Sequence, residues 1–178
     1  MKHFFVSLCL ALLAAACTNR QTTDATNSAD SARVDSVRTE TSTSLQLTPT
    51  LTNLGLTTNH DWRQVNIGDD FAVAKATESA ELFEQDANHI GYTKEFTNLE
   101  SVDFQYFQDS GKINKIQVDL YLNSAESVNT YLADLVLYLT TRYGTATTVD
   151  GVTTWQSGKV ELKNVSKGKD FGLKLTIK

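Results

Sequence analysis

The sequence has few cysteines and a single proline, and these shortages restrict its chemistry. Both cysteines of the 178 residues, Cys9 and Cys17, lie within the first 17 positions. The chain from Thr18 onward therefore excludes disulfides, thiolate metal sites and cysteine nucleophiles. The one proline, Pro49, leaves everything after it free of the residue that most strongly interrupts helices and strands.

A long hydrophobic run is also absent. The longest apolar segment extends from Phe4 to Ala16, about 13 residues, whereas a membrane-spanning helix needs about 20. Lys2 precedes this segment and three alanines end it. A basic start, an apolar middle and a small-residue end are typical of a removable export signal. We therefore interpret residues 1–16 as a signal peptide.

Cys17 follows directly after Ala14-Ala15-Ala16. These residues resemble the lipobox of bacterial lipoproteins, with the large aliphatic residue, Leu13, one place early. The resemblance implies that Cys17 is the lipidated first residue of the mature protein. It also implies a cell-envelope location, with anchoring to the outer membrane and a domain that faces the periplasm or the cell surface. Two or more acyl chains would make that anchoring stable.

Residues 17–58 are rich in Thr and Ser and contain few large apolar side chains before Leu45. Such a composition cannot bury enough apolar surface to offset the entropy of ordering, so we expect a disordered linker. Forty flexible residues would have a mean reach of roughly 30–35 Å. Asp30-Ser31-Ala32 and Asp35-Ser36-Val37 resemble the O-glycosylation acceptors of the Bacteroidota, which would make Ser31 and Ser36 modification sites; chance occurrence in a Ser-rich linker is the alternative.

Residues 59–178 are long enough for one domain with its own core. The clearest element is a helix over 124–143. Its apolar residues recur at spacings of three and four and give it one hydrophobic face, Ser124 or Asn123 can cap its start, and Gly144 can end it.

Alternating apolar and polar residues predict strands over 102–107, 113–122, 160–163 and 171–178. Further strands are expected at 62–67, 89–96 and about 148–156. The stretch 69–85 fits a helix or a strand, and we favour the helix. Together these elements predict a two-layer α+β domain, in which the long helix and possibly this second one cover a mainly antiparallel sheet of about five to seven strands.

The run Tyr143-Gly144, Trp155, Val160-Glu161-Leu162 and the final alternating strand resemble the C-terminal part of small lipoproteins of the Bacteroidota. The resemblance covers about the last 80 residues and implies fold and lineage. The layout is also similar to beta-lactamase-inhibitor-like modules.

Catalytic and metal-binding patterns are weak. The histidines after the signal segment, His60 and His89, have no nucleophile elbow near them in sequence. The acidic residues between 69 and 86 lack the spacing of a calcium loop, and no glycine-rich phosphate loop occurs. The sequence therefore predicts no catalytic residue, no metal site and no cofactor.

Charge is unevenly distributed. Residues 61–134 hold 14 acids and five bases, whereas the chain from Arg142 onward holds seven bases and three acids. A basic sheet face could bind an anionic partner, or the lysines could protect exposed strand edges from aggregation. The net charge of −5 and an exported location make nucleic acid an implausible partner.

The leading hypothesis is a membrane-anchored, non-enzymatic binding domain for a protein or envelope component. A small envelope hydrolase or ligand carrier is the alternative, with His89 beside Glu95 or Asp103 in a concave pocket. Inhibition of a specific secreted enzyme is a third hypothesis, suggested by architecture alone.

Overall fold

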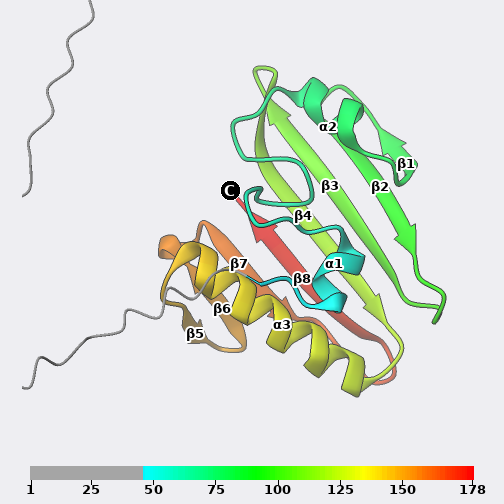
Figure 1. Cartoon of the computed structure of the whole chain (residues 1–178), viewed down its shortest axis with the longest axis vertical. Coiled ribbons are helices and arrows are strands. Elements are labelled where there is room, and N and C mark those ends of the chain that lie inside the picture. Colours follow the sequence, from blue (N-terminus) through cyan, green and yellow to red (C-terminus); the bar gives the residue numbers. More distant parts are fainter. Residues whose placement is uncertain (1–45) are drawn as a thin grey trace, which may run out of the picture. The chain divides into compact units, whose positions relative to one another are not determined.

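A computed structural model of the chain describes residues 46–178, which form one antiparallel sheet and three α-helices (Figure 1). The strands follow the spatial order β1-β2-β3-β4-β8-β7-β6-β5. The α+β class is confirmed, but the sheet has eight strands, not five to seven. The strands are β1 (Glu81–Gln85), β2 (His89–Glu95), β3 (Ser101–Asp109), β4 (Lys112–Leu122), β5 (Thr147–Val149), β6 (Val152–Trp155), β7 (Val160–Asn164) and β8 (Phe171–Ile177); the helices are α1 (Pro49–Leu54), α2 (Phe71–Thr77) and α3 (Ala125–Tyr143).

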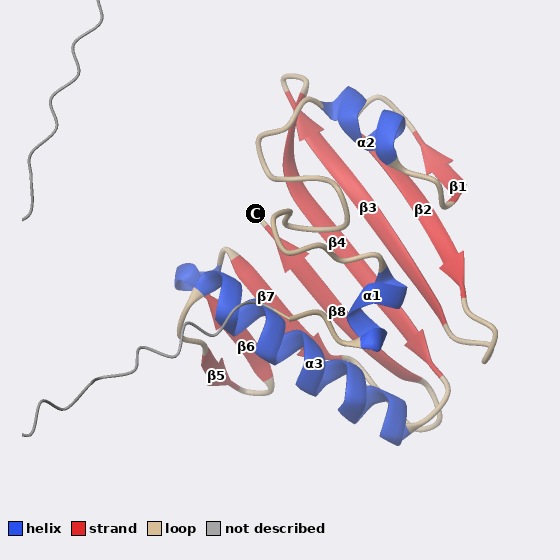
Figure 2. Ribbon diagram, viewed as in Figure 1, coloured by secondary structure: helices blue, strands red, loops and turns tan. Residues whose placement is uncertain are grey.

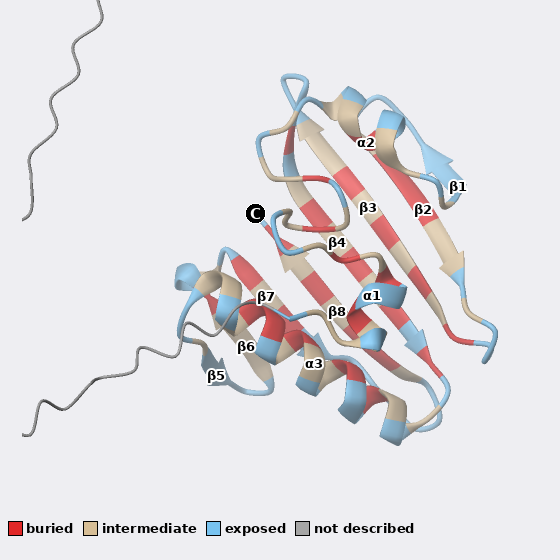
Figure 3. Cartoon of the chain, viewed as in Figure 1, coloured by how far each residue is buried: buried red, intermediate tan, exposed pale blue. Residues whose placement is uncertain are grey.

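The helices α1 and α3 lie on the same face of the sheet (Figure 2). Buried residues alternate with less buried ones along the central strands (Figure 3). In β3 these are Val102, Phe104 and Tyr106, each less than 1% exposed. Their neighbours Asp103, Gln105 and Phe107 are only partly buried on the opposite face. The two-residue period of a strand thus produces a covered face and an open face.

The predicted helix at 124–143 is confirmed as α3. The Ser124 side chain accepts a hydrogen bond from the backbone N–H of Ser127 at 3.1 Å, which caps the helix start. The helix ends at Gly144, whose φ of +86° a residue with a side chain rarely adopts. Its buried residues are Val128, Tyr131, Leu135, Tyr138 and Leu139.

The predicted helix over 69–85 is wrong in its second half. The helix α2 ends at Thr77, because the Glu78 side chain turns back and accepts hydrogen bonds from the N–H groups of Ser79 and Ala80. The chain then forms the edge strand β1, which pairs with β2 through a bulge near Phe83. Pairing with β2 therefore makes residues 81–85 a strand, although the apolar residues of 69–85 also have helical spacing.

Two predicted strands also have a different structure. Residues 62–67 form a tight turn in which Trp62 and Val65 exchange backbone hydrogen bonds of 3.1 and 3.0 Å, so both side chains enter the core. The single strand expected near 148–156 is a hairpin, β5–β6. It turns at Asp150-Gly151, whose φ angles of +51° and +76° match a two-residue hairpin turn.

The folded part begins before residue 59, so the assignment of 17–58 to a disordered linker extends too far. Thr48 caps α1, and its hydroxyl donates to Asp134 of α3 at 2.6 Å. Leu51, Leu54 and Leu56 are at most 4% exposed. These leucines supply core contacts that the long helix alone does not provide. None of the helices between residue 46 and the C-terminus is long and apolar enough to cross a membrane.

We predict that Leu54→Ala lowers the free energy of unfolding by about 2–5 kcal/mol, since a fully buried leucine leaves a cavity. Leu137→Ala is the matched control, because Leu137 on α3 is 61% exposed and should change stability by less than about 0.5 kcal/mol. Urea unfolding of both full-chain variants measures the difference. Equal effects would contradict a domain that includes α1.

Candidate functional site

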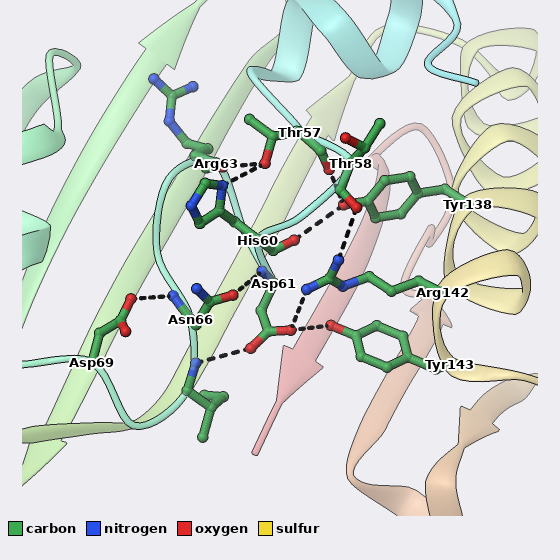
Figure 4. A network of polar contacts seen from close by, with 11 residues as sticks. Thr57, Thr58, His60, Asp61, Arg63, Asn66, Asp69, Tyr138, Arg142 and Tyr143 are labelled. Atoms are coloured by element: carbon green, nitrogen blue, oxygen red, sulfur yellow. Dashed lines mark hydrogen bonds and ion pairs between the residues drawn. The ribbon is translucent and has the colours of Figure 1, made fainter. Parts of the chain in front are cut away.

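A network of polar contacts lies on the covered face, around Asp61 (Figure 4). Its Oδ1 accepts hydrogen bonds from Arg142 at 3.0 Å and from the Tyr143 hydroxyl at 2.7 Å. Its Oδ2 accepts the backbone N–H of Ile67 at 2.9 Å. Both charged side chains of the Asp61–Arg142 pair are 17% exposed. These contacts attach the segment 57–69 to the C-terminal turns of α3.

His60 belongs to the same group and is held by its neighbours. The Thr57 hydroxyl donates its single proton to the Arg63 carbonyl at 2.9 Å and also lies 2.8 Å from His60 Nδ1. The Thr57 hydroxyl therefore lies between the Arg63 carbonyl and the His60 ring and fixes the position of both. The Tyr138 hydroxyl donates to the Thr57 carbonyl at 2.8 Å and lies 3.3 Å from the His60 carbonyl. These contacts hold the backbone of residues 57–63 against the end of α3.

A second charged pair, Arg63–Glu78, lies deeper in the core. Arg63 donates from Nε and Nη2 to the two Glu78 oxygens, each at 2.8 Å, and the side chains are 13% and 3% exposed. Its Nη1 donates to the Leu54 carbonyl at 2.7 Å, at the end of α1. The hydroxyl of Tyr106 lies 3.4 Å from Glu78. Sequence reasoning missed this pair, although Glu78 occupies a position on the apolar side of the helical pattern over 69–85.

His89 lies on the open face of the sheet, away from the residues predicted to accompany it. Its Nε2 is 3.2 Å from Glu84 and its Nδ1 is 3.0 Å from Asp86, whereas Glu95 and Asp103 lie farther along their strands. The ring stacks on Phe107 at a centroid distance of 5.3 Å. Backbone N–H groups of Asn88 and His89 lower the pKa of Asp86. The predicted His89–Glu95 or His89–Asp103 constellation is therefore wrong.

The rest of the open face is polar with scattered aromatic groups. Asp119 and Lys174 form a cross-strand ion pair at 3.3 Å. Tyr121 is 53% exposed, and partial burial, followed by the charges of Asp103 and Asp119, raises its pKa. A shallow hollow of about 200 Å³ lies beside Tyr121, above Gly172. A Cβ at Gly172 would approach the Leu120 carbonyl oxygen to 2.7 Å, so only glycine fits there.

The lysines of the C-terminal strands do not protect the sheet edges. Lys163 and Lys174 stand opposite each other on β7 and β8, which are interior strands of the sheet. Lys178 pairs with Glu161 at 2.9 Å. The edge strands are β1 and β5 instead, and β5 has three residues. The basic charges therefore contribute to the open face.

A groove of about 550 Å³ lies between α1, the N-terminal turns of α3 and the loop 96–100. Glu100, on this loop, is a buried charged residue, 2% exposed. It was not predicted, although Glu100, Val102, Phe104 and Tyr106 follow one two-residue period and so share a face. Burial, together with Glu100, raises the pKa of the adjacent Tyr131.

Cys17, Ser31 and Ser36 lie outside the described residues, so their proposed modifications remain predictions. Among residues 46–178, no group of three or more His, Cys, Asp or Glu side chains could hold a metal ion. Comparison of the chain with protein-family models, with curated proteins and with solved structures finds no match.

The contacts of Tyr143 predict a loss of stability in alkali. Burial, and then its hydrogen bond to Asp61, raise the pKa of Tyr143 above its ordinary value. A folded-state pKa above the unfolded value of about 10 contributes stability that is complete below pH ~10 and is lost as the pH rises through the folded-state pKa. We expect Tyr143→Phe to flatten this alkaline fall in urea unfolding. An unchanged slope in the variant would contradict this assignment.

Proposed function

We propose that this protein is a lipid-anchored, non-enzymatic binding domain of the cell envelope, which engages a protein or envelope component through the open face of its sheet. One observation carries the proposal: within residues 46–178, the helices pack on the same face of the sheet, and the opposite face of the central strands has no covering element. The Cys17 lipobox and the Ser- and Thr-rich segment behind it support the anchoring and the tether.

The chemistry of the open face suits a binding partner of mixed character. Phe83, Tyr121 and Val165 are 47%, 53% and 43% exposed. Between them lie the Asp119–Lys174 pair and glutamine side chains of β3 and β4, which can form new hydrogen bonds. Aromatic groups surrounded by polar ones are typical of interface centres.

The ligand-carrier alternative is favoured by a separate observation, the groove at Glu100. The hydrolase alternative has less support, because the Thr57 hydroxyl beside His60 donates to the Arg63 carbonyl, and both ring nitrogens of His89 contact carboxylates. Inhibition of a secreted enzyme would be one form of binding by the open face.

The anchor can be tested by fractionation. We expect the wild-type chain to sediment with membranes and to carry acyl groups on Cys17 in intact-mass measurements, whereas Cys17→Ser should enter the soluble fraction. The substitution leaves residues 46–178 unchanged, so the circular-dichroism spectra should agree. A Cys17→Ser protein that remains in the membrane fraction would refute lipid anchoring.

The binding face can be tested by photocrosslinking in whole cells. A photoreactive amino acid at Tyr121 or Lys174 should give a discrete crosslinked product, and the same group at Leu137, exposed on α3, is the matched control. In the Tyr121-labelled chain, Lys174→Glu should reduce the yield, because it reverses a charge on the proposed face. Recovery of the chain alone from the face positions, or equal products from Leu137, would count against the proposal.

A further inference from the structure

The Glu100 carboxylate is buried without a cation. It is 2% exposed, and the ion pairs among residues 46–178 do not include it. Its hydrogen-bond partner is neutral, the backbone N–H of Asn123 at 3.3 Å, and the neutral Tyr131 side chain lines the same groove. Removing a carboxylate from water is costly, and neutral donors compensate that cost less fully than an opposite charge does. Glu100 therefore retains the capacity to bind a positive group.

The groove that Glu100 lines has the size and the chemistry for such a group. Its volume of about 550 Å³ is within the range of small-molecule sites. Its walls provide hydroxyl, amide and carboxylate groups, and no Lys, Arg or His lines it. The principal polar residues are Asn53, Asn98, Glu100, Glu126, Ser127 and Tyr131.

The same geometry disfavours an anion. A helix N-terminus ordinarily attracts negative charge, but in α3 the Ser124 side chain already accepts the Ser127 N–H and Glu126 occupies the first turn. A second anion would meet both Glu100 and Glu126. The two carboxylates of the groove thus favour positive over negative charge, although Lys94 already donates to the Asn53 carbonyl on one wall. The acceptor groups of the other walls can receive the N–H donors of an ammonium ion.

We propose that this groove binds an alkylammonium group, as carried by a lysine side chain or by a small free amine, with Glu100 as its charge partner and Glu126 at the rim. The site lies on the covered side of the sheet and is therefore distinct from the open face. It gives the protein a second binding function that does not depend on the first.

The experiment follows backbone amide resonances of the isotope-labelled full chain in detergent micelles. The probes are acetyl-Gly-Lys-Gly-amide, the same peptide acetylated on the lysine Nε, and cadaverine. We expect the unmodified peptide or cadaverine to shift the resonances of Glu100, Ser127 and Tyr131, and the acetylated peptide to leave them unchanged. A shift with the peptide alone assigns the site to a lysine side chain, and a shift with cadaverine alone assigns it to a free amine.

Variants separate a specific charge contact from general attraction. Glu100→Gln should weaken binding at least about tenfold, because a buried carboxylate loses its charge. Glu126→Gln, at an exposed position that should not affect folding, should weaken it about two- to fivefold. Glu81→Gln, exposed on β1 and outside the groove, is the matched control and should have no effect.

Three outcomes would overturn the proposal: no shift at the groove with either amine, equal shifts with the acetylated peptide, or a loss of affinity in Glu81→Gln equal to that in Glu126→Gln. If Glu100→Gln fails to fold, the Glu126→Gln and Glu81→Gln comparison still decides the question.

Discussion

The buried pair Arg63–Glu78 connects the parts of the domain that local sequence does not connect. Arg63 is held at a φ of +55°, an uncommon conformation for a residue with a side chain, and its guanidinium reaches Glu78, the end of α1 and the face of Phe104. Glu78 in turn ends α2 and starts the passage into β1. In typical proteins, removal of one partner leaves the other charge buried and lowers the free energy of unfolding by about 3–5 kcal/mol. The pair therefore specifies one path for the segment between α1 and β1.

That path determines which face of the sheet is closed. The segment 55–70 crosses the same side as α3, and the Asp61–Arg142–Tyr143 contacts attach it to the end of that helix. The hydrophobic side chains of β3, β4 and β8 are then covered from one direction only. Their alternate positions carry Asp103, Gln117 and Lys174, which are only partly buried on the opposite face. The proposed binding face is thus a consequence of how one side of the core is filled.

Predictions succeeded where one local pattern was strong and unopposed. The spacing of apolar residues and the capping Ser124 were sufficient for α3, and the alternation in 102–107 and 113–122 was sufficient for the central hairpin. They failed where a local pattern had two solutions. The sequence around Trp62 and Val65 fits a strand as well as a tight turn. Only packing of both side chains against the sheet selects the turn. At 69–85, Glu78 has the right spacing for a helix but finds its charge partner 15 residues earlier, at Arg63.

The sequence by itself determined the α+β class, the long helix, the central strands and the expectation of a lipidated Cys17, because these follow from periodicity and from a short contiguous motif. Tertiary structure alone decided that α1 belongs to the domain, that the sheet has eight strands, and that Glu100 is enclosed beside a groove. Burial and ion pairing depend on residues far apart in the chain. A single carboxylate has the same local sequence signal whether it is solvated or enclosed, and only the packed fold distinguishes the two.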